Sequence, residues 1–296
     1  MPAPPRFDFA GFAICGLALA STELVLESAG RQLVPLWAEL ALGALAIAGM
    51  ALYRWHAHRT PNPAVDLRIF RLRSFSLSVL AGGVCRMGLS AVPFLLPLQL
   101  QLGFGMTAMQ SGAITFVSSL GAILMKSASP RILRRFGFRN LLIGNGLLVG
   151  VVIVGLAAFT SATPHLLIYG YLLLFGFMRS VQFTCFNTLG YADVPADMMS
   201  RATSVSSVGQ QLSMSFGVAV GATLLGLLVG PGGTVTAAEF HVVYPLVAAL
   251  PVVGSLFFFQ LLPTDGTQVS GYRPRAVSQA AVASASPSAS RNAPAP

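Results

Sequence analysis

Eight apolar runs, each close to the length of a membrane-spanning helix, follow one another along this chain. A helix that spans a bilayer needs about 20 mostly apolar residues. The runs cover residues 9–26, 36–53, 75–100, 108–128, 140–159, 166–191, 204–229 and 242–262. Backbone groups inside lipid must be satisfied within the protein, so we predict that each run forms a helix. The sequence therefore predicts an all-α membrane protein with eight transmembrane helices.

Composition agrees with a membrane protein and argues against a soluble one. Hydrophobic residues make up 54% of the chain and charged residues 9%, whereas about 25% of a soluble domain is charged. The net charge of +9 would suit nucleic-acid binding in a soluble protein. Here the basic residues lie in short loops between apolar runs, so we expect them to contact membrane lipids and to set orientation, with no nucleic acid as partner.

The basic residues are distributed unevenly between the two sides of the predicted membrane. Of eighteen Lys and Arg residues, fifteen fall on the side of both termini, one falls on the other side, and two lie inside apolar runs. Cytoplasmic loops carry an excess of such residues. We therefore expect both termini to lie in the cytoplasm.

Four segments follow from these runs. We expect a two-helix transmembrane hairpin over residues 1–60, a cytoplasmic amphipathic basic linker over 61–74, a six-helix domain over 75–262 and a disordered cytoplasmic tail over 263–296. The linker mixes apolar and basic residues as a helix on an anionic membrane surface would. A solvated basic linker is the alternative. The tail is rich in Ala, Ser and Pro, a composition that does not form a packed core.

The two basic residues inside apolar runs are Arg86 and Arg179, and each follows a glycine by three positions, at Gly83 and Gly176. With a rise of 1.5 Å per residue, both lie about 17 to 18 Å from the cytoplasmic end of their helices, near the middle of the bilayer. Their helices begin two consecutive groups of three spans. Matching features in two such groups predict two inverted three-helix repeats, as in transporters with a binding site at the midplane.

A cation near the middle of a bilayer is costly and commonly marks a functional site. We expect Arg86 and Arg179 to face a central aqueous cavity and to bind an anionic substrate group or a coupling carboxylate, because a guanidinium grips a carboxylate with two hydrogen bonds. The alternative is that each arginine packs among carbonyls or serines and only fixes the bundle. Neutral contacts to the same cavity are expected from five amide side chains: Gln99, Gln182, Asn187, Gln210 and Gln211.

Carboxylates that could carry a proton are scarce, since the last six apolar runs contain no Asp or Glu. Glu23 and Glu27 lie toward the outer end of the first run, and either is a candidate proton site. The alternative places both at the outer interface in contact with water. His56 and His58 have no acidic or cysteine residue nearby in the sequence, so we expect no metal site.

Small residues recur at every fourth position of the seventh run, at Gly209, Ser213, Gly217 and Gly221. This spacing places them on one face of a helix. Such a face is typical of close helix packing in membranes. We expect it to be a packing seam, and the same seam supports the alternative function of a non-transporting membrane protein that binds a partner.

Several motifs resemble the carboxy-terminal half of fourteen-helix drug:proton antiporters of the major facilitator superfamily. They are residues 93–101 (PFLLPLQLQ), 110–112 (QSG), 131–139 (RILRRFGFR), 191–195 (YADVP), 200–204 (SRATS) and 210–211 (QQ). By this resemblance residues 1–60 are the two extra central helices of the family and residues 75–262 its carboxy-terminal six-helix domain. The likeness extends from about residue 8 to residue 262.

The resemblance also implies a function and a location. A cytoplasmic gating loop is implied at Arg131, Arg134, Arg135, Gly137 and Arg139, although this loop lacks the aspartate of the family pattern. The chain is expected to be half of a multidrug efflux antiporter of the bacterial inner membrane. It would work by alternating access, driven by a proton gradient and without a cofactor.

The implied partners are a small-molecule substrate, anionic or amphiphilic, and a further protein component. The amino-terminal six-helix half of the family is missing from this sequence. We therefore expect a truncated or split transporter that needs such a half or a second copy of itself. No catalytic constellation sits near the membrane surface, so an enzyme is disfavoured.

Overall fold

The computed structural model describes residues 8–28, 35–60, 63, 67–230, 233–262, 265–266, 269 and 272. In this part of the chain every regular element is a helix, and eight helices are long and apolar enough to cross a membrane. The long helices are α1 (Phe9–Ser28), α2 (Leu36–Arg59), α3 (Arg73–Leu98), α4 (Ala108–Leu156), α5 (His165–Ala192), α6 (Met199–Val229) and α7 (Ala237–Leu256). Helix α4 contains two of the eight spans. The eight predicted spans and the all-α membrane fold are confirmed.

Four short helices join or extend the long ones. They are η1 (Leu67–Arg71), η2 (Gln99–Gly103), η3 (Ala196–Met198) and η4 (Phe257–Gln260). In η1, Ile69 is fully buried against Phe75 and Val79 of α3. This part of the predicted linker is therefore packed onto the bundle. The predicted tail lies outside the described residues except at positions 265, 266, 269 and 272.

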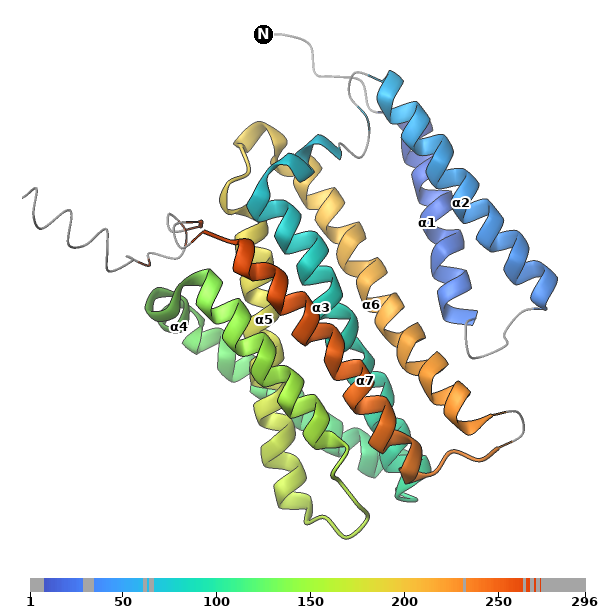
Figure 1. Ribbon diagram of the computed structural model, residues 1–296, viewed down its shortest axis with the longest axis vertical. Coiled ribbons are helices and arrows are strands. Elements are labelled where there is room, and N and C mark those ends of the chain that lie inside the picture. The colour runs from blue at the N-terminus through green and yellow to red at the C-terminus, as the bar shows by residue number, and fades with distance from the viewer. Residues whose placement is uncertain are drawn as a thin grey trace, which may run out of the picture.

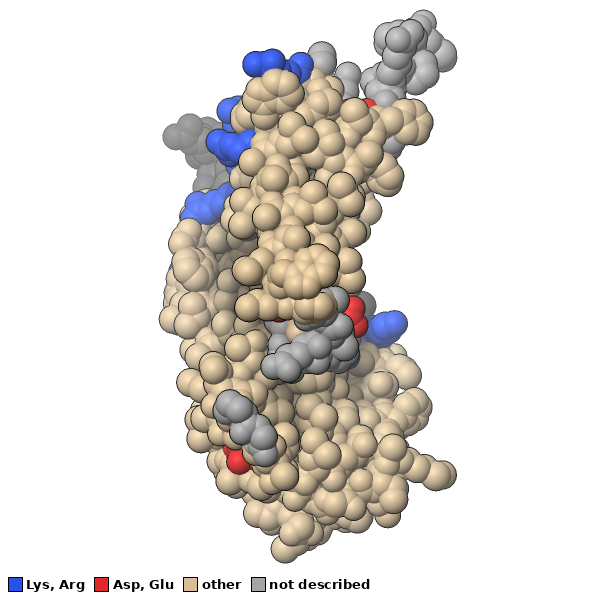
Figure 2. Space-filling model, turned by 90° about the vertical axis from the view of Figure 1, so that its right-hand side faces the viewer, with Lys and Arg blue, Asp and Glu red and all other residues tan. Residues whose placement is uncertain are grey.

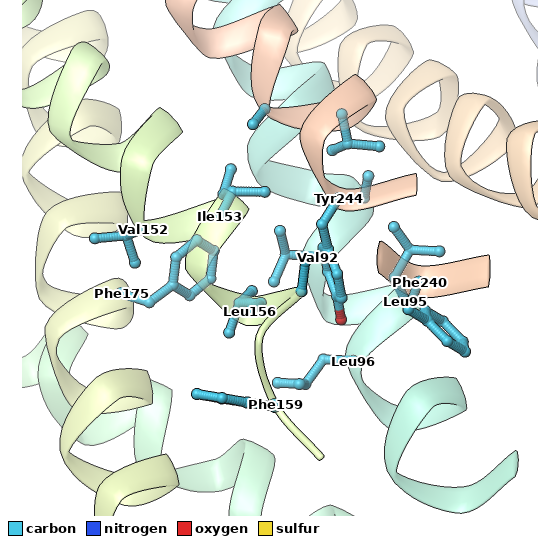
Figure 3. Packing of buried hydrophobic residues seen from close by; sticks show 14 of the residues in the cluster. Val92, Leu95, Leu96, Val152, Ile153, Leu156, Phe159, Phe175, Phe240 and Tyr244 are labelled. Carbon is cyan, nitrogen blue, oxygen red and sulfur yellow. The ribbon is translucent and has the colours of Figure 1, made fainter. Parts of the chain in front are cut away.

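Helices α3 to α7 form a bundle, and α1 and α2 form a hairpin at its side (Figure 1). Helix α3 lies at the centre of the bundle and packs against α5, α6 and α7. Figure 3 shows part of the core, where Val92 and Leu95 of α3 meet Ile153 of α4, Phe175 of α5 and Tyr244 of α7. Large apolar side chains from four helices thus fix the positions of α3, α4, α5 and α7.

The outer surface suits a lipid environment. Many large apolar side chains of α1, α2 and α4 are exposed, among them Trp37, Ile47 and Phe116. Figure 2 shows that the visible face is mostly uncharged, with most of its Lys and Arg atoms gathered toward its upper end. An apolar band with basic residues near one end is the surface expected of a multi-pass membrane protein.

The segment predicted as the gating loop, residues 131–139, is helical instead. Helix α4 runs through it and is interrupted only at Gly137, whose φ of 69° and ψ of 168° are non-helical. Such a positive φ favours glycine. Leu133 and Phe138, on either side of the break, are buried in the cluster that contains Phe186 and Phe258. Burial of these apolar side chains among the arginines explains why the residues on both sides of the break are helical where a loop was predicted.

The seam of small residues on α6 packs against α3 of the same chain. An added Cβ on Gly209 would lie 2.9 Å from Val79, and one on Gly217 would overlap the carbonyl oxygen of Met87. Gly221 faces Ala91 and Leu95, and Ser213 faces Gly83. The backbones of α3 and α6 approach closely along the whole seam. Helix α3 therefore covers the face that the alternative function assigned to a partner protein.

The hairpin is closed at one end by Asp8 and His56. The Nε2 atom of His56 lies 2.9 Å from Oδ1 and 3.1 Å from Oδ2 of Asp8. Asp8 also caps α1, because the backbone N–H of Gly11 donates to its Oδ1 atom at 2.8 Å. The sequence offered no nearby acidic partner for His56, yet the hairpin brings one from 48 residues away. Among the described residues no cluster of three metal-binding side chains occurs.

Candidate functional site

A cavity of about 780 Å³ lies where the hairpin meets the bundle. Its walls come from α1, α3, α4, α5 and α6. Three charged side chains line it, namely Glu23, Glu27 and Arg179. Much of the remaining wall is apolar, with Phe94 and Phe183 among its larger members. Its volume and its mixture of apolar walls with a few polar groups are typical of small-molecule sites.

Arg179 projects from α5 into this cavity and is half-buried. A second cavity of about 330 Å³, lined by Thr115, Ser118 and Phe175 among others, also includes Arg179 in its wall. Within the described ranges no residue forms a hydrogen bond or an ion pair with its guanidinium. An arginine presents five N–H donors. Arg179 is therefore a strong donor group that faces two cavities and is not used by the rest of the fold.

Glu23 reaches the same cavity from α1. The hydroxyl of Ser215 on α6 donates a hydrogen bond to its Oε2 atom. Its Oε1 atom is buried and accepts no hydrogen bond from any residue that the structure describes. Glu27, one turn further along α1, is exposed and lines the cavity as well. The structure thus brings Glu23 and Arg179, which are far apart in the sequence, to one cavity.

Arg86 has a different environment. It is 1% exposed, and it lines neither of the two cavities. One terminal nitrogen donates to the carbonyl oxygen of Ser78 at 3.3 Å and the other to Oδ1 of Asn187 at 3.1 Å. Its guanidinium carbon lies 4.8 Å from the centre of the Phe186 ring. The expectation that both arginines face one cavity is therefore corrected, since Arg86 joins α3 to α5 inside the bundle.

Three of the five predicted cavity amides are also part of the packing between helices. Asn187 accepts the hydrogen bond from Arg86. Gln182 is fully buried, accepts from Asn145 at 2.8 Å and donates to the carbonyl oxygen of Leu142 at 3.2 Å. These contacts hold α5 against α3 and α4. The same holds for Gln99, which accepts from the hydroxyl of Tyr244 at 2.9 Å and donates to the backbone of α4.

The two remaining amides lie on α6. Gln210 donates to Ser206 at 3.2 Å within its own helix. Gln211 lines the larger cavity and is exposed. Of the five amides, Gln211 is thus the one that the structure places in this cavity. The predicted gating arginines lie elsewhere: Arg131, Arg134 and Arg135 are exposed on α4, Arg139 is half-buried, and none of them lines either cavity.

Sequence reasoning missed the serine that holds Glu23 and the aromatic wall of the cavity. Ser215, Val218 and Ala222 follow Gln211 at helical spacing and form the cavity face of α6, next to the face that carries the glycine seam. This periodicity was a usable signal for Ser215. Phe183 follows Arg179 and Phe94 follows Ser90 by four positions, so the same helical spacing was a usable signal for the aromatic wall.

Comparison with known proteins gives the family. A model of the Major Facilitator Superfamily matches residues 9–218. A protein of Escherichia fergusonii with the provisional name multidrug resistance protein MdtD is 33% identical over 276 residues, or 89% of this chain. Its namesake in Yersinia enterocolitica is 32% identical over 288 residues, or 93% of this chain. The chain spans 56% and 59% of the length of these two relatives.

The family match begins in α1 and ends in α6, so it includes the hairpin and every helix that lines the cavity. It agrees with the eight apolar spans found in the described part of the chain. The chain is a multi-pass membrane protein and belongs to the major facilitator superfamily.

Proposed function

We propose that this chain is half of a proton-coupled efflux antiporter for small molecules of the multidrug type. It works by alternating access in the bacterial inner membrane, with both termini in the cytoplasm, and it moves its substrate without chemical conversion. Support comes from the family match and from relatives named for multidrug resistance. Because those relatives are longer, we propose that the chain acts together with an amino-terminal six-helix half or a second copy.

The observation that carries this proposal is the cavity shared by Arg179 and Glu23. A partly apolar cavity with few polar groups suits a range of amphiphilic molecules. Arg179 supplies a fixed positive charge for the substrate. Glu23 supplies a carboxylate that binds and releases a proton, with Glu27 as the second candidate, so the proton gradient is the energy source and no cofactor takes part.

The proposal is tested in inside-out membrane vesicles from cells that lack other drug exporters and that produce the chain together with the amino-terminal six-helix half of a longer relative. Respiration acidifies the vesicles, and acridine orange reports the pH gradient while cationic, anionic and zwitterionic amphiphiles are added. We expect at least one compound to dissipate the gradient. Arg179→Ala and Glu23→Gln should abolish this response, and Arg179→Lys should restore it only in part, because lysine lacks the bidentate geometry.

Two matched substitutions outside the cavity serve as controls. Arg54→Ala and Glu39→Gln remove one charge of each sign from α2, and both should leave the response intact. If no compound dissipates the gradient, or if Glu23→Gln responds like the parent, the proposal of proton-coupled efflux is wrong. Full transport by the chain without any other component would contradict the half-transporter.

The alternative of a non-transporting protein that assembles through the α6 seam loses its support. The seam was its motivating feature, and α3 of the same chain occupies that face along Gly209, Gly217 and Gly221. A partner helix would have to displace α3, the most buried of the candidate spans in the described part of the chain.

A further inference from the structure

Three serine hydroxyls line the larger cavity, and each of them donates a hydrogen bond within the protein. The single O–H of Ser90 is shared between the carbonyl oxygens of Met87 and Met214, and the hydroxyl of Ser180 donates to that of Ala122. Ser215 donates to Glu23. Each serine hydroxyl that lines this cavity thus donates its one hydrogen bond to an acceptor within the chain.

Two charged groups of opposite sign remain. The Arg179 guanidinium has no acceptor, and the Glu23 Oε1 atom has no donor, among the residues that the structure describes. Both line the same cavity, yet they do not pair with each other within the 4 Å that defines an ion pair. A buried polar atom without a partner is rare in folded proteins, and a ligand is one explanation for it.

We infer that the ligand of this cavity is an amphipathic zwitterion. Its carboxylate binds Arg179, its ammonium group binds the carboxylate of Glu23, and its apolar body lies on the wall formed by Phe94, Phe183 and Met214. This inference rests on the proposed function, because it takes the cavity as the substrate site. It narrows the expected anionic or amphiphilic substrate to one that carries both charges, separated by an apolar spacer.

The opposite charges of Glu23 and Arg179 favour a zwitterion over a ligand with a single charge. A simple anion would satisfy Arg179 and leave the Glu23 carboxylate with the hydrogen bond from Ser215 alone, next to a second carboxylate at Glu27. A simple cation would satisfy Glu23 and leave Arg179 without an acceptor. Unpaired charges in such surroundings are costly. A ligand with both charges satisfies both groups while Glu23 is ionised.

Binding of matched probes to the purified full chain in nanodiscs tests the inference. The probes are ω-amino acids of six to ten carbons, together with the alkanoic acids and alkylamines of the same lengths, and calorimetry with empty nanodiscs supplies the baseline. The flexible spacer lets the two charges adapt to the separation of Glu23 and Arg179. Because each charge-assisted contact is worth a factor of about ten or more, we expect one ω-amino acid to bind at least about tenfold more tightly than either singly charged probe.

Two variants separate the contributions of the two ends. In Arg179→Ala the ω-amino acid should bind no more tightly than the alkylamine, and the affinity for the alkylamine should be unchanged. In Glu23→Gln the ω-amino acid should bind no more tightly than the alkanoic acid, and the affinity for the alkanoic acid should be unchanged. The amide oxygen of the new glutamine can still accept the hydrogen bond from Ser215. Arg54→Ala and Glu39→Gln should change none of these affinities. Thermal unfolding of every variant checks that the chain is folded.

Equal binding of all three probe classes, or no binding of any probe, would overturn the inference. So would a loss of the amine contribution in Glu27→Gln instead of Glu23→Gln. The proposed function can fail separately. Zwitterion binding without any proton-driven efflux would overturn the antiporter and leave this inference standing. Efflux with no preference for zwitterions would overturn this inference alone.

Discussion

At the scale of residues, the two arginines inside apolar runs show what one sequence motif can and cannot specify. Both follow a glycine by three positions. Arg179 faces two cavities, whereas Arg86 is buried between α3 and α5 with Ser78 and Asn187 as acceptors. The depth of each charge could be read from helix length. The direction of each side chain could not, because both helices are apolar around most of their circumference.

This contrast predicts opposite effects of alanine at the two positions. Arg86→Ala removes two hydrogen bonds and an aromatic contact and leaves a void, so it should lower the free energy of unfolding by about 2 to 4 kcal/mol. Arg179→Ala removes a half-buried charge with no acceptor among the described residues and should leave stability nearly unchanged. Unfolding of both variants by sodium dodecyl sulfate in mixed micelles measures the difference. Equal losses at the two positions would contradict the assignment of Arg86 to the packing of the bundle.

The amides show the same limit. Gln99 and Gln182 looked like cavity residues because polar groups are rare in these runs. Their actual partners are Tyr244, 145 residues away in the chain, and Asn145 on α4. A buried amide needs partners for both its oxygen and its nitrogen. Such partners come from the tertiary arrangement, which the local pattern of a single run does not contain.

At the scale of elements, α6 has two neighbouring faces with different tasks. One face carries Gly209, Gly217 and Gly221 against α3, and the other carries Gln211 and Ser215 at the cavity. The spacing of small residues predicted the first face, since close helix approach demands small side chains at every turn. Substitutions in the two faces should therefore affect stability and ligand binding separately.

Gly217→Ala should destabilise the chain, because an added Cβ overlaps Met87 and Ser90 of α3. We expect a loss of about 1 to 3 kcal/mol, as for other overpacked positions. Gly226→Ala is the matched control on the same helix, with no atom within 4 Å of its added Cβ. It should be neutral or slightly stabilising, since alanine favours helix over glycine. The same detergent titration compares the two, and equal stability of both variants would show that the seam is not tightly packed.

At the scale of the whole molecule, the length and polarity of the apolar runs sufficed to predict the number of membrane spans. They did not predict which spans are in contact. Apolar length is a local property, so all eight runs were found. The helical conformation of residues 131–139, apart from the break at Gly137, was missed because arginines interrupt the apolar pattern there. The contact between the hairpin and α6 was also missed, although it brings Glu23 to the cavity.

That contact predicts a specific crosslink between hairpin and bundle. In a cysteine-free background, Glu23→Cys with Ser215→Cys should be joined by a short bifunctional thiosulfonate reagent. A protease site inserted at residues 61–62 then reports the link, because crosslinked chains stay as one band on a denaturing gel. Leu45→Cys with Ser215→Cys is the control, since Leu45 lies on α2 and is exposed. Separation of the first pair into two fragments would contradict the position of the hairpin.

The position of Arg179 between two cavities has a consequence for inhibition. A compound that fills only the smaller cavity, beside Thr115 and Phe175, reaches the guanidinium from the other side. By binding the guanidinium there, it would make Arg179 unavailable to a ligand in the larger cavity without overlapping that ligand. Its shape would be complementary to the smaller cavity alone. Mutations in the aromatic wall of the larger cavity would then not remove any contact with the inhibitor.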